Sequence, residues 1–160
     1  MHRVEYGLFE QKSVDGLAAV AGKLEQDATV LKERIRGLRI SPDRMMAGTA
    51  SALNRFASTA SDEGEDRYAH TDLQALSGLL EGAAKTANVL RPIVEKVDQK
   101  AFEGIDKDAA SIKSLLGADA QGNGFKAYDA LSPDEKAKFK DGAAQLAAQF
   151  TKLRDQLGVD

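Results

Sequence analysis

The sequence predicts an all-α protein, built as an antiparallel bundle of four to five main helices. Apolar residues recur at spacings of three and four along most of the 160 residues, which is the period of a helix with one buried face. Two Ser-Pro pairs each combine an N-cap residue with a proline at the first helical position. No stretch alternates in the way of a half-buried strand, so no β-strand of any length is expected.

The most regular apolar pattern lies near the N-terminus. Steps of three and four residues connect Val14, Leu17, Ala21, Leu24, Ala28, Leu31, Ile35 and Leu38. This heptad-like spacing predicts one long helix whose apolar seam packs against partner helices. Residues 2 to 9 also have helical character, although so short a segment is not stable alone.

Two more helices are expected in the middle of the chain. Ser41-Pro42 begins the first, and Thr71 followed by Gln74 resembles a capping box for the second. Pro92 should kink or end that second helix. The apolar residues expected on their buried faces are Met46, Ala50, Leu53, Phe56 and Ala60, then Leu73, Leu76, Leu80, Ala83, Ala87 and Leu90.

The last two helices are expected after Asp98 and after Ser132. Asp98 can cap the first of them, and Ser132-Pro133 with Glu135 forms the clearest capping box of the sequence. A flexible loop is predicted between them over residues 118 to 124. The apolar residues expected inside are Phe102, Ile105, Ala109, Ile112 and Leu116, then Phe139, Ala143, Leu146, Phe150, Leu153 and Leu157.

The composition excludes several classes of function. Hydrophobic residues make up 42% and charged residues 29%, so the chain should fold in water as one domain over residues 1 to 160. The net charge of -3 gives no electrostatic reason to bind nucleic acid. Without cysteine, disulfides, thiolate catalysis and sulfur-ligated zinc are excluded. No apolar run approaches the roughly 20 residues that span a bilayer.

His2 and Glu5 form the first candidate metal site. On a helix, residues three apart project from one face and can share one ion, as Glu-x-x-His pairs do in bundle metal sites. Two ligands are at most half of a site. The alternative interpretation is a solvated ion pair, and that interpretation is favoured on spacing alone.

Asp66, His70 and Asp72 form the second candidate. They cluster just before an expected helix and offer oxygen and nitrogen donors. The alternative is that Thr71 and Asp72 serve the first-turn amides and the helix dipole, with His70 exposed at the helix entrance. Capping is favoured on spacing alone.

Three stretches of the chain together resemble a known family. They are His2–Phe9 (HRVEYGLF), Glu65–Leu73 (EDRYAHTDL) with a following helix that contains Leu90-Arg91-Pro92, and Tyr128–Ser132 (YDALS) before the final helix. In this order they are similar to the imelysin-like helical domain of the EfeO and EfeM family of iron-uptake proteins. His2 and Glu5 match part of the G-x-H-x-x-E motif that contributes to that family's metal site; its glycine would precede Met1.

The resemblance implies an iron-binding protein of the periplasm or cell surface, although no secretory signal is expected in this chain. His2 and Glu5 are carried over as expected metal ligands, and Asp66, His70 and Asp72 are added as a guess. The implied ion is ferrous or ferric iron, but zinc or another divalent metal suits the same donors. The implied partners are a membrane iron permease and the associated peroxidase of the uptake system.

Family domains have further helices ahead of the H-x-x-E segment, so the resemblance implies an incomplete, N-terminally truncated domain. Such a bundle would expose an apolar groove, which predicts a homodimer or a swapped assembly.

Two other functions stay open. One is a structural or interaction module whose groove takes a helix, and the other is the binding of an anionic polysaccharide, against which the acidic balance argues. We expect no enzymatic activity, because the sequence contains no H-E-x-x-H motif and no evident pair of nucleophile and base.

Overall fold

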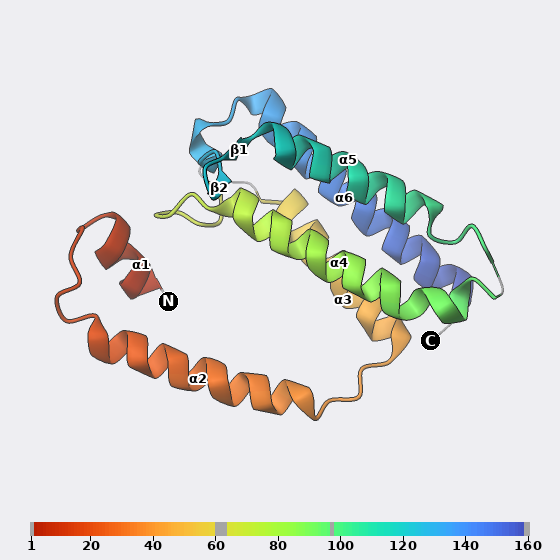
Figure 1. Ribbon diagram of the computed structural model, residues 1–160, viewed down its shortest axis with the longest axis horizontal. Helices are drawn as coiled ribbons and strands as arrows, with labels where there is room; N and C mark the ends of the chain where they lie inside the picture. The colour runs from red at the N-terminus through yellow and green to blue at the C-terminus, as the bar shows by residue number, and fades with distance from the viewer. Residues whose placement is uncertain (1, 60–63, 97, 159–160) are drawn as a thin grey trace. The chain divides into compact units, whose positions relative to one another are not determined.

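The computed structural model describes residues 2–59, 64–96 and 98–158, most of which are helical (Figure 1). The helices are α1 (His2–Phe9), α2 (Ala18–Arg36), α3 (Pro42–Ala57), α4 (Asp72–Val94), α5 (Glu103–Ala118) and α6 (Pro133–Leu157). Two short strands, β1 (Ala120–Gln121) and β2 (Gly124–Phe125), and a 3-10 turn, η1 (Tyr128–Ala130), lie between α5 and α6. The prediction of an all-α fold with several antiparallel helices is confirmed.

The chain divides into two compact units. The N-terminal unit contains residues 1–40 and 66–69, and the four-helix unit contains residues 41–65 and 70–160. The first therefore holds α1 and α2, and the second holds α3 to α6 with the small strands and η1.

The four-helix unit is an up-down-up-down bundle. α3 and α5 run in one direction and α4 and α6 in the other, as the colours of Figure 1 show. α6 packs against α3 and α5, and α4 packs against the same two helices, so the four form a closed ring. Each helix thus has two antiparallel neighbours, the arrangement that short connections favour.

The core of this unit is made by the apolar faces that the sequence period predicts. Buried residues in the helices are Met46, Ala50, Leu53, Phe56, Leu73, Leu76, Ala83, Ala87, Leu90, Val94, Ile105, Ile112, Leu116, Phe139, Ala143, Leu146, Ala147, Phe150 and Leu153. Of the other residues expected inside, Leu80, Ala109 and Leu157 are half-buried against this core. Phe102 is buried just before α5, and Ala60 lies outside the described residues.

The start of α6 confirms the predicted capping box. The Ser132 side-chain oxygen accepts a hydrogen bond from the Glu135 backbone N–H, and Glu135 accepts one from the Ser132 backbone N–H at 2.6 Å. These bonds satisfy two amide groups that a helix N-terminus otherwise leaves unpaired. They also lower the pKa of Glu135 from 4.5 to about 2, with the Ser132 hydroxyl as the largest cause.

Two other predicted caps do not form, although α4 begins at Asp72 as expected. Thr71 makes no side-chain cap on α4, and its backbone lies outside the extended region that N-cap residues adopt. α5 begins at Glu103 rather than after Asp98, whose carboxylate instead accepts a hydrogen bond from the Lys100 backbone N–H. The prediction of no β-strand is wrong at one place: the loop after α5 contains the short antiparallel pair β1–β2, in which Ala120 is paired with Phe125.

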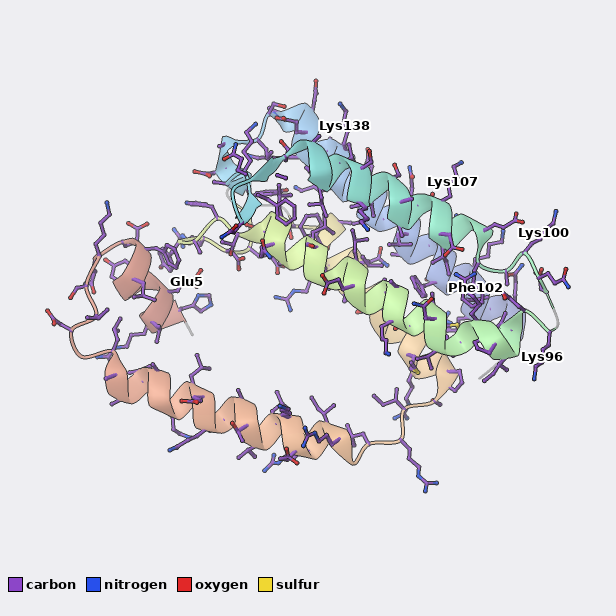
Figure 2. All side chains as sticks on the ribbon, in the orientation of Figure 1. Glu5, Lys96, Lys100, Phe102, Lys107 and Lys138 are labelled. Atoms are coloured by element: carbon purple, nitrogen blue, oxygen red, sulfur yellow. The ribbon has the colours of Figure 1, made fainter. Side chains whose placement is uncertain are left out.

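The connection between α4 and α5 is held by Arg91. α4 continues through Pro92 and ends at Val94, close to the predicted break. The Arg91 guanidinium lies 4.6 Å from the centre of the Phe102 ring and makes ion pairs with Asp106 (2.7 Å) and Glu95 (2.9 Å). The hydrogen bond to Asp106 is the main cause that raises the Arg91 pKa above its ordinary value. Phe102 is labelled in Figure 2.

The N-terminal unit has few buried side chains. Gly7 of α1 is buried against Leu17, and a Cβ at Gly7 would lie 2.8 Å from a Leu17 methyl carbon, so the close approach requires glycine. The rings of Tyr6 and Tyr68 meet edge to face with centroids 5.3 Å apart. α2 contains no buried residue, although the sequence predicts a packed seam along it.

Among the described helices, none is both long and apolar enough to cross a lipid bilayer.

Leu146 tests the core of the four-helix unit. It is 0% exposed, so Leu146→Ala should lower the free energy of unfolding by about 2–5 kcal/mol through lost burial and the cavity left behind. Val89→Ala is the matched control, because Val89 on α4 is 48% exposed and its change should stay within about 0.5 kcal/mol. Urea denaturation measures both. Equal losses would contradict the packing described.

The lowered pKa of Glu135 predicts that the free energy of unfolding depends on pH. Its pKa is lower in the folded chain than the ordinary 4.5, so its charged form stabilises the fold above that pH. The stabilisation is lost as the pH falls toward the folded pKa of about 2. Thermal unfolding of Glu135→Gln should therefore lose less stability over this acid range than the unchanged chain does. A Ser132→Ala chain should show the Glu135 carboxyl titrating at higher pH by NMR, and an unmoved titration would contradict the capping geometry.

Candidate metal-binding residues

His2 and Glu5 lie on α1, where their spacing of three brings the side chains together. The His2 Nδ1 atom is 3.6 Å from a Glu5 carboxylate oxygen. The His2 side chain is 85% exposed, whereas the Glu5 side chain is 17% exposed. Glu5 is labelled on α1 in Figure 2. The pair therefore presents one imidazole and one carboxylate from a single helix face, as the sequence predicts.

This pair offers two donors of the kind that bind iron, zinc and other divalent metals. Within residues 2–59, 64–96 and 98–158, no group of three or more His, Asp or Glu side chains is arranged to hold a metal ion. An ion bound by His2 and Glu5 would therefore complete its coordination with groups outside the pair, such as water or a chelating anion.

Asp66 belongs to the same unit as His2 and Glu5. It is half-buried and begins the segment 66–69, which is part of the N-terminal unit. Two residues later, Tyr68 makes the edge-to-face contact with Tyr6 of α1. The first part of the second candidate cluster is therefore positioned by an aromatic contact with α1, a connection that sequence spacing gave no reason to expect.

His70 belongs to the four-helix unit and has an unusual backbone. Its φ is +54°, in the left-handed region that residues other than glycine rarely adopt. Its carbonyl oxygen accepts a hydrogen bond from the Tyr128 backbone N–H at 3.0 Å. Its Nε2 atom lies 3.8 Å from an Asp129 carboxylate oxygen, with the two side chains 27% and 47% exposed. This places a histidine and a carboxylate together at the entrance of α4.

Asp129 is the candidate residue that sequence reasoning missed. It lies in η1, far from His70 in the sequence, and no periodic pattern relates the two. The only available signal was that Tyr128–Ser132 and Glu65–Leu73 are both stretches that carry the family resemblance. The structure brings these two stretches into contact through the bond between His70 and Tyr128 and through the ion pair with Asp129.

Asp72 has a structural role in the same region. It is the first residue of α4 and is 3% exposed. Its carboxylate accepts a hydrogen bond of 2.6 Å from the Glu65 backbone N–H. The positive end of the α4 dipole also favours a negative charge at this position. Asp72 thus holds the preceding loop against the start of α4.

The candidate residues therefore fall into two groups. His2, Glu5 and Asp66 belong to the N-terminal unit, and His70, Asp72 and Asp129 belong to the four-helix unit. Each group combines imidazole and carboxylate donors.

The fold and these donors define a helical-bundle protein that presents histidine and carboxylate groups at helix starts. A family model described as Imelysin, or Peptidase_M75, matches residues 1–159. The chain belongs to the imelysin family.

Relatives of this chain include components of iron uptake systems. It is 31% identical over 160 residues to "Iron uptake system component EfeM" of Pseudomonas syringae, covering 99% of this chain and 56% of that protein. It is 32% identical over 159 residues to "Iron uptake system component EfeO" of Yersinia pseudotuberculosis, and 30% identical to that of Escherichia coli K12. Both EfeO matches cover 99% of this chain and 42% of the relative. The chain therefore spans about half the length of the relatives it matches.

Gly64 tests the loop that Asp72 holds. Its φ is +89°, and a Cβ there would collide with the Asp72 carboxylate. Gly64→Ala should therefore lower the free energy of unfolding by about 1–2 kcal/mol or more, from backbone strain and the displaced carboxylate.

Gly78→Ala is the matched control. Gly78 lies inside α4 with open space around its Cα, so alanine there should stabilise the chain by about 0.5–1 kcal/mol. Urea denaturation of the two variants should give changes of opposite sign. A Gly64→Ala chain as stable as the unchanged one would contradict the close contact with Asp72.

Proposed function

We propose that this chain is a non-catalytic, iron-binding component of a bacterial iron-uptake system, working in the periplasm or at the cell surface. The observation that carries the proposal is the match over 99% of the chain to proteins named as iron uptake components. Membership of the imelysin family over residues 1–159 supports the same role. The chain spans about half the length of these relatives. That it shares the activity of the whole relative is therefore itself proposed.

His2 and Glu5 are the proposed ligands. Their atoms lie 3.6 Å apart on one face of α1, close enough for both to approach one ion with a small change of rotamer. The high exposure of His2 leaves it accessible to an ion from solvent. Imidazole and carboxylate suit ferrous and ferric iron, and they also suit zinc or another divalent metal. Iron is the cargo in this proposal.

Asp66, His70 and Asp72 are proposed as further ligands of secondary importance. His70 is the best placed of the three, because Asp129 is 3.8 Å away and supplies a carboxylate beside it. Asp72 also binds the Glu65 backbone N–H, so its removal would disturb the loop as well as any metal.

A non-catalytic role is proposed although the family name includes the word peptidase. The relatives are named as uptake components, and the sequence has no H-E-x-x-H motif. Its two histidines, His2 and His70, cannot form the one-turn pair that this motif supplies to zinc. The proposed partners are a membrane iron permease, its associated peroxidase and a second copy of this chain.

A structural or interaction module is the second candidate function. The observation that favours it is α2, whose apolar seam is left exposed. In that case the chain would bind a helix through α2, and His2 and Glu5 would form only a surface ion pair.

Metal titration by calorimetry tests the proposed function. Ferrous, ferric and zinc ions are titrated into the chain and into a His2→Ala/Glu5→Ala variant. Because both ligands are removed, the variant should bind iron at least about tenfold more weakly. Glu10→Ala is the matched control, since Glu10 is an exposed carboxylate just past the end of α1 and should leave the affinity unchanged.

Circular dichroism should show nearly the same helix content for all three chains, because none of the substituted residues belongs to the buried apolar core. Equal iron affinity of the double variant and the unchanged chain would remove His2 and Glu5 as ligands. Lack of iron binding by the unchanged chain would contradict the proposal and leave the interaction module.

A further inference from the structure

α1 carries the His2 and Glu5 side chains and is the shortest α-helix of the described chain. It has eight residues, and a helix of that length is not stable in water without tertiary contacts. Gly7 is its one buried residue. The positions of the His2 and Glu5 side chains therefore depend on the contacts that hold α1.

Local contacts hold the C-terminal end of α1. The Tyr6 carbonyl oxygen accepts a hydrogen bond of 3.0 Å from the Glu10 backbone N–H. The Gly7 carbonyl oxygen accepts one of 3.0 Å from the Ser13 backbone N–H, and Leu17 packs on Gly7. All of these partners lie between α1 and α2, so they link the helix only to the chain that directly follows it.

The Tyr6 side chain makes a contact of much longer range in the sequence. Its ring meets the Tyr68 ring edge to face, with centroids 5.3 Å apart and ring planes at 70°. This is a favoured geometry for aromatic pairs and stabilises them beyond the area that they bury. Tyr6 directly follows Glu5 and lies four residues after His2. A contact at Tyr6 therefore acts on the turn of α1 that carries both proposed ligands.

Tyr68 lies on a short segment whose two flanking residues are fixed by hydrogen bonds. The Glu65 backbone N–H donates to the Asp72 carboxylate at 2.6 Å. The His70 carbonyl oxygen accepts a hydrogen bond of 3.0 Å from the Tyr128 backbone N–H. Only four residues separate Glu65 from His70, so the segment between them is a short loop with both ends held. Little additional ordering is needed to hold the Tyr68 ring against its partner.

We propose that Tyr68 is a positioning residue for an iron site on α1, which rests on the proposed role of His2 and Glu5 as ligands. Tyr68 gives no atom to the ion. It acts through Tyr6, by favouring the arrangement of α1 in which both ligands are held ready. When a binding-competent state is only partly populated, the apparent affinity falls by that fraction. A contact that raises the population of this state therefore raises the affinity for iron.

The same contact relates Asp66 to α1. Asp66 lies two residues before Tyr68 and belongs, like α1, to the N-terminal unit. Because Asp66 and Tyr68 share one short segment, the contact between the two rings limits where the Asp66 carboxylate can lie relative to α1. Tyr68 thus positions two proposed donors, Glu5 through the Tyr6 ring and Asp66 through the chain.

Calorimetric titration of the full chain with ferrous iron, in the absence of oxygen, tests this role. Tyr68→Ala and Tyr6→Ala each remove one ring and should weaken iron binding about two- to tenfold, the range that one aromatic pair supplies. Tyr68→Phe keeps the ring without its hydroxyl and should retain the affinity of the unchanged chain. Tyr6→Ala/Tyr68→Ala should bind no more weakly than either single variant, because both residues act through one contact.

Hydrogen exchange separates positioning from a general loss of folding. In the metal-free chain, Tyr68→Ala should speed the exchange of the α1 amides, because α1 then loses its contact with residues 66–69. The amides of α6 should exchange as in the unchanged chain, because Tyr68 is not part of the core of the four-helix unit.

The reciprocal effect is measured by NMR with zinc, which suits the same donors. A metal bound on α1 should favour the ring contact by the factor with which the contact favours the metal. Zinc should therefore strengthen the nuclear Overhauser effect between the Tyr6 and Tyr68 rings. In the His2→Ala/Glu5→Ala chain, zinc should leave this effect unchanged.

The outcomes distinguish this role from the proposed function. Tyr68→Ala that binds iron as tightly as the unchanged chain overturns the positioning role and leaves the iron site on α1. An unchanged chain that binds no iron contradicts the iron site and the positioning role together. A visible absorption band with ferric iron that is absent from Tyr68→Phe would make the Tyr68 hydroxyl a ligand, and would also overturn a role of the ring alone.

Discussion

The buried face of α6 is the interaction on which the four-helix unit depends. Phe139, Ala143, Leu146, Phe150 and Leu153 are all 2% exposed or less, and they are packed where α6 meets α3 and α5. The helix begins at a complete capping box, so its first turn is held by local hydrogen bonds in addition to its packing. Lys140 adds a polar link by donating a hydrogen bond to the Thr59 carbonyl oxygen at 2.5 Å. Burial along α6 thus fixes the frame on which the loops are placed.

The second candidate group depends on that frame through Tyr128. Tyr128 is 1% exposed, its ring meets Phe56 of α3 edge to face at 6.3 Å, and the Lys136 ammonium lies 5.4 Å from the ring centre. Because Tyr128 is held in the core, its backbone N–H fixes the His70 carbonyl, and its neighbour Asp129 comes within reach of the His70 side chain. The position of this partly exposed pair of side chains therefore follows from the burial of one aromatic residue.

The period of apolar residues and the capping residues predicted the features that depend on neighbours close in sequence. The inner faces of α3 to α6 and the Ser132 cap could be predicted because helix period and capping bonds involve residues a few positions apart. The failures concern contacts that sequence spacing does not encode. Thr71 looks like a cap, but the backbone there takes another conformation and Asp72 binds the loop instead. His70 and Asp129 meet only through the fold, and the period of α2 shows that a face needs covering without showing by what.

The left-handed backbone of His70 means that one substitution would have two opposite effects, one on stability and one on the side chains at this position. Glycine adopts φ near +54° without the steric cost that a histidine bears there, so replacement by glycine would relax the chain. The same change would delete the imidazole beside Asp129. The side chain at this position is therefore carried at a cost in backbone conformation that glycine would not bear.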